Sequence, residues 1–246
     1  MSEIKKTEAV VLSKLNYGDS SLIVTLFTKE QGKISAIVKG ARSPKSRTSL
    51  KIDPLNYIEI VYYNKESRDL QIISSADLME YYPAIKSDLD KLKYAQSVLE
   101  LVKNLTVEHE QHVRLFNGII RIFELLETSN ERLNAIFARF FMFFLEEIGY
   151  RVHLVDCSVC GKKNLLDKNL SYNFAVGLLC EDCKTNYAES FALNQELFNC
   201  LLSLRTSKNL DDIGSQTVDN ALIFMEKYLK YHVADFKGIQ SLQLFK

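Results

Sequence analysis

The hydrophobic and polar positions of the first eighty residues repeat at a period of two. At residues 33–39, for example, Ile34, Ala36 and Val38 alternate with a second, mostly polar set. This alternation, in short runs rich in Val, Ile, Thr, Tyr and Phe, predicts β-strands with one buried face. In the segment TKEQGK, Gly32 occupies the hairpin position that needs a positive φ angle. Five strands are predicted, over residues 8–15, 22–28, 33–39, 57–63 and 70–78.

The period changes near Tyr82 and Pro83, and the apolar residues then recur at helical spacing. Helices are predicted from residue 86 to about 105, over 111–126, over 130–148, near 194–204 and over 215–236. No helix long enough for a parallel crossover separates the five strands, which favours a small closed or nearly closed barrel. The predicted fold class is therefore α+β with two domains. Residues 1–80 form the barrel, and residues 81–246 form an all-helical domain with an insertion at about 153–187.

The composition is that of a folded globular chain. Hydrophobic residues make up 47% and charged residues 25% of the 246 residues, so a buried core is available. The first twelve residues are charged and too short for a signal peptide. The most apolar run, residues 135–149, contains Arg139, Glu146 and Glu147 and is shorter than the roughly 20 apolar residues of a membrane span. We therefore expect a cytoplasmic protein.

Four of the five cysteines form two close pairs. Two residues separate Cys157 from Cys160 and Cys180 from Cys183, and nineteen residues lie between the pairs. This spacing lets both sulfurs of a pair reach one ion, and zinc prefers four thiolates at about 2.3 Å. We predict one structural Zn²⁺ ion, because four sulfurs leave no open position for a catalytic water.

Other readings of these cysteines stay open. The four thiols could be buried without a metal or could be redox-active, although a strand-to-helix CxxC context is lacking. His153 could replace one cysteine as a ligand, but an ordinary loop histidine is the simpler interpretation. The fifth cysteine, Cys200, is expected in the core on an apolar helix face.

A basic stretch stands out in a chain with 31 basic and 31 acidic residues. Between Lys29 and Lys51 there are seven basic residues and one acid, Glu30. A solvated loop with extra lysines would explain this run. Cationic charge beside a barrel, with aromatic side chains nearby, is also the pattern of a nucleic-acid site. The predicted phosphate ligands are Lys33, Lys39, Arg42, Lys45 and Arg47, and the candidate stacking residues are Tyr17, Phe27, Tyr57, Tyr62 and Tyr63, with Phe27 expected in the core.

These residues resemble a known family. The segment LNYGDSSLIVTLFTKEQGKISAIVKGARSPKS is similar to the opening of the bacterial RecO family of recombination mediators. The later segment from Phe174 through Gly177 to Cys180 and Cys183 resembles the zinc segment of that family. Two features differ. Leu178 replaces a second glycine before the third cysteine, and Asp53-Pro54-Leu55 replaces a Pro-Phe pair.

The resemblance implies a fold and a set of partners that composition and spacing do not reveal. It implies an oligonucleotide/oligosaccharide-binding (OB) barrel at the N-terminus and binding of single- and double-stranded DNA. It also implies annealing of complementary strands, partnership with RecR, contact with the single-strand-binding protein, and support of RecA loading. For the acidic, aromatic tail of the single-strand-binding protein, a helical groove with an arginine at its rim is expected. Arg114, Arg121, Arg132 and Arg139 are the candidates.

Two other functions are alternatives to DNA binding. An enzyme is disfavoured because the chain has no Gly-rich phosphate loop, no HExxH motif and no nucleophile elbow. Glu146 and Glu147 are adjacent on a predicted helix, so their side chains point in different directions. A non-enzymatic adaptor that binds protein through the barrel and carries a structural zinc is the second alternative.

Overall fold

A computed structural model describes residues 3–44, 46, 48–65, 67–163, 165, 169–206 and 210–243. Contacts along the chain divide it into two compact units. The first contains Met1–Ser129 together with Gln240–Lys246, and the second contains Asn130–Ile239.

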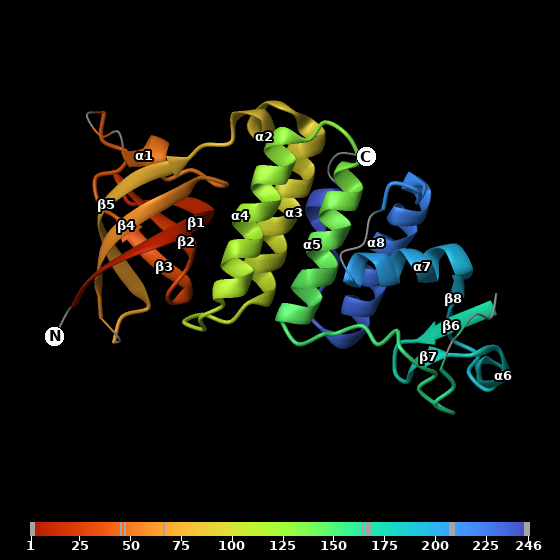
Figure 1. Cartoon of the computed structure of the whole chain (residues 1–246). Helices are drawn as coiled ribbons and strands as arrows, with labels where there is room; N and C mark the ends of the chain where they lie inside the picture. The colour runs from red at the N-terminus through yellow and green to blue at the C-terminus, as the bar shows by residue number, and fades with distance from the viewer. Residues whose placement is uncertain are drawn as a thin grey trace. The chain divides into compact units, whose positions relative to one another are not determined.

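Five strands form a closed barrel in the first unit (Figure 1). They are β1 (Glu3–Tyr17), β2 (Ser21–Thr28), β3 (Gly32–Val38), β4 (Tyr57–Asn64) and β5 (Leu70–Glu80). Their order around the barrel is β1-β2-β3-β5-β4; only the β3–β5 pairing is parallel. This is the arrangement of an OB-fold barrel, so the predicted five strands and the fold class are confirmed.

The barrel closes because alternate residues of each strand carry apolar side chains into its interior. Ile34, Ala36 and Val38 of β3 are all buried, as the sequence pattern predicts. Tyr62 is fully buried, and its hydroxyl donates to Gln31 Oε1 at 2.9 Å, which satisfies the polar end of the ring. Gly32 has a φ of 62°, as predicted for the turn before β3.

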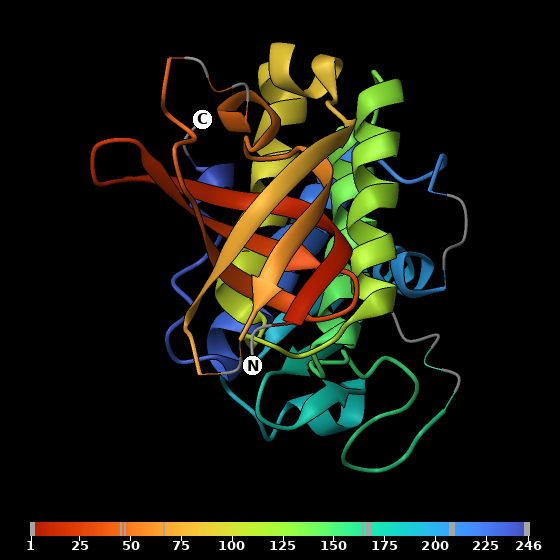
Figure 2. The ribbon, with the colours of Figure 1, turned by 90° about the vertical axis from the view of Figure 1, so that its left-hand side faces the viewer.

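Strand β1 is longer than predicted and pairs with two neighbouring strands. Residues 3–10 pair with β4 and residues 9–17 pair with β2, and the pairing with β2 contains a bulge between Val11 and Ser13. The β1–β2 hairpin projects from the barrel (Figure 2). Its outward face carries Leu15, which is 66% exposed, and Tyr17, which is 51% exposed. The sequence pattern did not predict the first and last residues of β1. Both faces of the strand are largely exposed there, so apolar and polar residues do not alternate.

Helices complete the first unit. They are α1 (Thr48–Lys51), α2 (Pro83–Ser87), α3 (Leu89–Leu105), α4 (Val113–Thr128) and the 3₁₀ turn η1 (Gln240–Leu242). Asp88 caps α3 by accepting the N–H groups of Asp90 and Lys91. Helix α3 packs against β1 and β2, and the Glu100 carboxylate accepts the N–H groups of Gln240 and Ser241 at 2.7 and 2.8 Å. Helix α2 was not predicted, since one turn gives too few residues to show a period.

Within the described residues, the second unit combines four helices with a small sheet. Its elements are α5 (Leu133–Glu147), β6 (Asn169–Asn173), β7 (Gly177–Leu179), α6 (Glu181–Lys184), β8 (Phe191–Asn194), α7 (Gln195–Arg205) and α8 (Ser215–His232). Helix α8 packs against α5 and α7. Tyr172 of β6 meets Phe224 of α8 edge to face at 5.2 Å, which joins the sheet to the helices. Within the described residues, no helix is long and apolar enough to cross a membrane.

Candidate nucleic-acid interface and metal centre

Lys33 lies at the start of β3, where the segment after α3 covers the barrel. Its ammonium group donates to the backbone oxygens of Lys103 in the last turn of α3, at 2.7 Å, and of the C-cap residue Thr106, at 2.5 Å. The His109 N–H returns a hydrogen bond to the Lys33 carbonyl at 3.0 Å. Burial lowers the pKa of the Lys33 amine. The side chain therefore caps a helix C-terminus, a position that favours a cation.

Lys39 and Arg42 lie beyond the other end of β3. Both side chains are exposed, and Lys39 has no ion-pair partner among the described residues. The Arg42 guanidinium donates to the backbone oxygens of Ser21, at 3.2 Å, and Gly18. The Arg42 N–H donates to the Ser20 carbonyl at 2.9 Å. Arg42 therefore links the loop after β3 to the tip of the β1–β2 hairpin. Its guanidinium group remains exposed at the surface.

The other basic residues of the stretch have different environments. Lys29 pairs with Glu8 at 3.0 Å, and Lys51 pairs with Asp77 at 3.0 Å. These ion pairs cancel two of the seven positive charges counted in the sequence. Lys45 and Arg47, two of the predicted phosphate ligands, lie outside the described residues.

The candidate stacking residues divide into core and surface. Phe27 and Tyr62 are fully buried, which confirms the prediction for Phe27 and removes Tyr62 from the surface. The Tyr57 hydroxyl donates to Glu8 Oε2 at 2.8 Å. Tyr17 and Tyr63 are exposed, at 51% and 39%. Tyr17 shares the hairpin that Arg42 holds, so this aromatic ring and two cationic side chains belong to one end of the barrel.

The four paired cysteines converge in the second unit. The sulfurs of Cys157, Cys160, Cys180 and Cys183 all lie within 4.8 Å of one another, and Cys160 and Cys180 are 3.8 Å apart. Four thiolates at about 2.3 Å from a central ion would lie about 3.8 Å from each other by tetrahedral geometry. The residues therefore fit a tetrahedral metal ion, and the predicted grouping of the four cysteines is confirmed.

Local backbone geometry holds this cluster together. Gly161, at a φ of 72°, donates its N–H to the Cys157 carbonyl at 2.8 Å and closes the first turn. The Cys183 N–H donates to the Cys180 carbonyl at 3.2 Å in the second turn. Ser158 N–H bonds to the Leu178 carbonyl at 2.8 Å, which ties the first turn to β7. Leu178, the departure from the family pattern, is buried in that strand.

The electrostatics of the cluster favour a thiolate at Cys157. Burial opposes ionisation of this thiol, but N–H groups of Cys160, Cys180 and Val159 point to its sulfur and lower its pKa to about 6. The Cys180 N–H lies 3.4 Å from that sulfur. A deprotonated sulfur is the form that binds a metal ion. His153 is outside the cluster and pairs with Asp156 at 2.6 Å, whereas Cys200 is buried in α7, as predicted.

The arginines predicted to line a groove are occupied by other groups. Arg132 donates to the Ile213 carbonyl at 2.7 Å, and Arg121 pairs with Glu124 at 3.3 Å. Arg114 and Arg139 also make interactions of their own.

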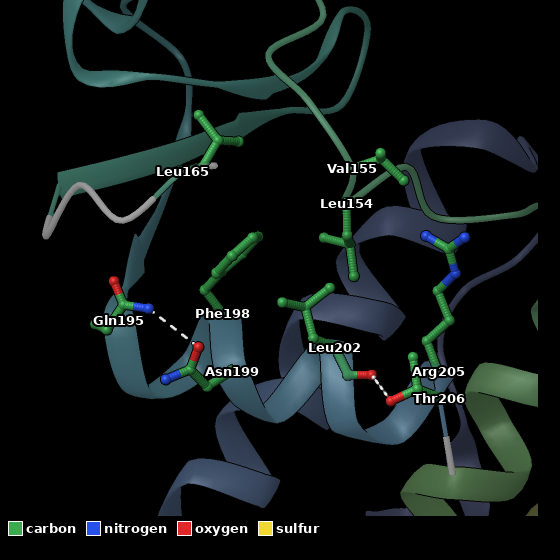
Figure 3. Close-up of a pocket in the computed structure, with 9 residues that line it drawn as sticks. All are labelled: Leu154, Val155, Leu165, Gln195, Phe198, Asn199, Leu202, Arg205 and Thr206. Atoms are coloured by element: carbon green, nitrogen blue, oxygen red, sulfur yellow. Dashed lines mark hydrogen bonds between the residues drawn. The ribbon is translucent and has the colours of Figure 1, made fainter. Parts of the chain in front are cut away.

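A pocket of about 430 Å³ lies elsewhere in the second unit, between α7 and the segment that leads to the cysteines (Figure 3). Leu154, Phe198 and Leu202 line it, and Arg205 lies at its edge. No motif marked Arg205, a single basic residue at a helix end.

Comparison with known protein families agrees with this arrangement of barrel, helices and four-cysteine cluster. One family model, described as Recombination protein O N terminal, matches residues 1–82, and a second, described as Recombination protein O C terminal, matches residues 86–238. The chain belongs to the recombination protein O family. The resemblance seen in the sequence is thereby confirmed along both parts of the chain.

Curated relatives in this family are named DNA repair protein RecO. The one from Chloroherpeton thalassium is 28% identical over 258 residues, which cover 98% of each chain. The one from Alkaliphilus metalliredigens is 30% identical over 252 residues and also covers 98% of each chain. A third, from Chlorobium limicola, is 35% identical over 159 residues, or 65% of this chain and 61% of the relative.

Proposed function

We propose that this protein is a DNA repair and recombination mediator. In this role it binds single- and double-stranded DNA, anneals complementary strands, and with RecR helps to load RecA on DNA coated by single-strand-binding protein. In this role the protein catalyses no reaction and acts by binding DNA strands and partner proteins. Family membership along the whole chain is the observation that carries it.

The proposed contact with DNA is electrostatic and independent of sequence. Lys39 and Arg42 supply positive charge at one end of the barrel and bind phosphates. Lys45 and Arg47, which follow them in the sequence, are proposed to bind phosphates as well. We do not propose Lys33 as a phosphate ligand, because its ammonium group already donates hydrogen bonds to backbone carbonyls at the C-terminal end of α3. Contacts to phosphate position a strand without reading its bases, which suits a mediator. The same charge lowers the repulsion between two strands during annealing.

The hairpin adds an aromatic contact to this surface. Tyr17 is exposed at its tip, and stacking of a base on an aromatic ring contributes about 1 to 3 kcal/mol. Arg42 holds the tip through three backbone oxygens, so we propose that it positions Tyr17 as well as attracting phosphate. Lysine at position 42 keeps the charge but cannot reproduce the branched donor geometry of the guanidinium group.

The metal is proposed to be one Zn²⁺ ion held by Cys157, Cys160, Cys180 and Cys183. Bound there, it would cross-link two loops and stabilise the segment between α5 and α7. With four sulfur ligands it offers no open position to a substrate, so its role is structural.

The salt dependence of DNA binding tests the phosphate surface. The variant Lys39→Ala/Lys45→Ala/Arg47→Ala removes three proposed contacts and leaves the Arg42 bridge in place. The slope of log affinity against log salt should fall by about 2 for single strands, or about 0.7 per contact. The matched variant Lys5→Ala/Lys93→Ala/Lys103→Ala changes three lysines elsewhere in the first unit and should keep the slope. An unchanged slope in the first variant would remove these residues from the interface.

The same measurements separate the rival functions. A gel-shift assay at low and moderate salt that detects no DNA binding would favour the protein-binding adaptor. Metal-dependent cleavage of the DNA would instead favour an enzyme.

Fluorescence tests the hairpin, because the chain contains no tryptophan. In Tyr17→Trp, the only indole reports on the hairpin tip, and stacking on bases should quench its emission when an oligonucleotide binds. Tyr231→Trp, on the exposed face of α8, is the control and should show no quenching. Adding Arg42→Lys to Tyr17→Trp should reduce the quenching while the salt slope is retained. Full quenching with Arg42→Lys would show that the bridge is not needed.

We further propose that the pocket beside α7 receives the tail of the single-strand-binding protein. Its apolar walls suit an aromatic side chain, and the Arg205 guanidinium suits a carboxylate (Figure 3). A labelled synthetic peptide with acidic residues and a C-terminal phenylalanine serves as the probe in fluorescence anisotropy. Arg205→Ala should weaken binding about tenfold, whereas Lys237→Ala, another basic residue of this unit, should not. Equal affinities would exclude this pocket.

A further inference from the structure

A second pocket lies in the first unit, away from the cationic end of the barrel. Its volume is about 340 Å³, and it is formed where the ends of β4 and β5 approach α2 and α4. Its lining combines aromatic and apolar side chains with three carboxylates: Tyr57, Met79, Glu80, Tyr82, Ile120, Glu124, Glu127 and Thr128. Neither the phosphate surface nor the metal centre uses these residues.

Two tyrosines give the pocket firm walls. The Tyr57 hydroxyl is fixed by its hydrogen bond to Glu8, and the Tyr57 ring lies edge to face with Phe116 at 6.2 Å. Tyr82 is buried and packs edge to face against Phe123 at 5.5 Å. Both rings are therefore held before any ligand arrives, which reduces the entropy lost on binding.

The three carboxylates differ in how far they are engaged. Glu127 accepts the N–H groups of Ala84 and Ile85 at 2.8 and 2.9 Å, so it caps α2. Glu80 accepts only the N–H of its neighbour Tyr81, at 3.1 Å, and it has no ion pair within the described residues. Glu124 pairs with Arg121 at 3.3 Å in an exposed bridge. Exposed bridges of this kind are weak and can be exchanged for another partner.

The residues that line the pocket include three carboxylates and no basic side chain. Burial raises the pKa of Tyr82, and the charges of Glu80, Glu124 and Glu127 raise it further. A phosphate chain is repelled by such a site, so the occupant is expected to be a cation. The carboxylates do not gather closely enough to share one metal ion, since among the described residues only the four cysteines do so. A flat, extended cation fits carboxylates that are spread along a groove.

The chain on either side of the lining residue Glu80 carries exposed apolar side chains. Leu78, Met79 and Tyr81 are 41%, 51% and 45% exposed at the end of β5. The Lys86 ammonium lies 4.0 Å from the centre of the Tyr81 ring, so a cation and an aromatic ring already meet next to this segment. Exposed aromatic and apolar residues around a charged pocket are typical of a protein interface.

From these observations we propose that the pocket binds an arginine side chain of a protein partner. The guanidinium group stacks beside the half-buried Tyr57 ring and donates to Glu80 and Glu124, while the neighbouring apolar side chains cover the flanking residues of the partner. Arginine fits better than lysine because its planar group can donate to two carboxylates and stack at the same time. This inference is independent of DNA binding, since it concerns a negative surface.

Methionine methyl groups provide a direct test in the full-length chain. The sequence has four methionines. Met79 lines the pocket, whereas Met142 and Met225 are buried in the second unit and serve as internal references. With ¹³C-methyl methionine, N-acetyl-arginine amide should shift the Met79 signal in a saturable way, with a Kd of about 1 to 10 mM. N-acetyl-citrulline amide, which has nearly the same shape but no charge, should leave the signal in place.

Variants decide whether the carboxylates are responsible. Glu80→Gln/Glu124→Gln removes two exposed charges and leaves Glu127 to cap α2, and it should weaken the arginine probe at least about fivefold. Asp69→Asn, an exposed acid elsewhere in the first unit, should bind the probe as the parent protein does. Absence of a saturable Met79 shift up to about 50 mM probe would overturn the proposal. Equal shifts with citrulline, or unchanged affinity in the double variant, would also overturn it.

Discussion

Replacement of Lys33 by methionine separates a structural lysine from a phosphate ligand. Methionine keeps the apolar stem of the side chain and removes the ammonium group. Two charge-assisted hydrogen bonds to the C-terminus of α3 are lost, at 2.7 and 2.5 Å. Each such bond contributes about 1.5 to 3 kcal/mol. Water can replace the donor at the exposed Lys103 carbonyl, so we expect a net loss of about 2 to 3 kcal/mol.

The assay is urea unfolding followed by far-UV circular dichroism. With a slope of about 2 kcal/mol per molar urea, the midpoint of the first unit should fall by about 1 M. The matched variant is Lys39→Met, because Lys39 is exposed and has no ion pair among the described residues. Its midpoint should stay unchanged, but its DNA salt slope should fall by about 0.7. A Lys33→Met protein with normal stability and a reduced salt slope would refute the assignment of Lys33 to the helix end.

Three further predictions concern the turn before β3, the metal centre and acid stability. Gly32→Ala should destabilise by about 2 to 4 kcal/mol in the same urea assay, because its Cβ would lie 1.8 Å from a backbone oxygen of the loop after α3. Gly40→Ala, also at a positive φ but with nothing within 4 Å, should cost only about 1 kcal/mol. Cys160→Ser should reduce the zinc content measured by atomic absorption from about one ion per chain, with the barrel's DNA affinity unchanged. Hydrogen bonds from Lys29 and Tyr57 lower the pKa of Glu8, so the stabilisation measured against Glu8→Gln should be present above pH 4.5 and disappear as the pH falls through the folded-state pKa.

Features encoded in neighbouring residues could be predicted from the sequence. The five strands follow from a period of two, and the cysteine cluster follows from two short repeats of one spacing. Helix α5 follows from four phenylalanines on one face and the glycine that ends it. The predicted boundary between residues 80 and 81 marks the change of period. Contacts between residues in the folded chain place α2, α3 and α4 in the same unit as the barrel. Such contacts join residues that are distant in sequence, so a local pattern does not reveal them.

The charge of the basic stretch could not be interpreted in the same way. Lys33 contacts residues about seventy positions away, and Lys51 pairs with Asp77 across the fold. Counting the basic residues of the stretch does not show which of them bond to distant parts of the chain. The count therefore overstates the number of positive charges that are available to DNA. Arg205 gave no signal, because one arginine at a helix end is ordinary until the pocket beside it is known.

The return of the chain to the first unit through η1 determines how the protein can be dissected. The Glu100 carboxylate accepts hydrogen bonds from Gln240 and Ser241, which follow α8 in the sequence. The barrel unit is therefore built from two separate segments of the chain. A fragment ending at residue 129 would lack its own C-terminal piece and leave a half-buried carboxylate without those donors. A designed linker from residue 129 to residue 240 would instead produce an uninterrupted miniature protein. The excised residues 130–239 would form a separate polypeptide that retains all four clustered cysteines.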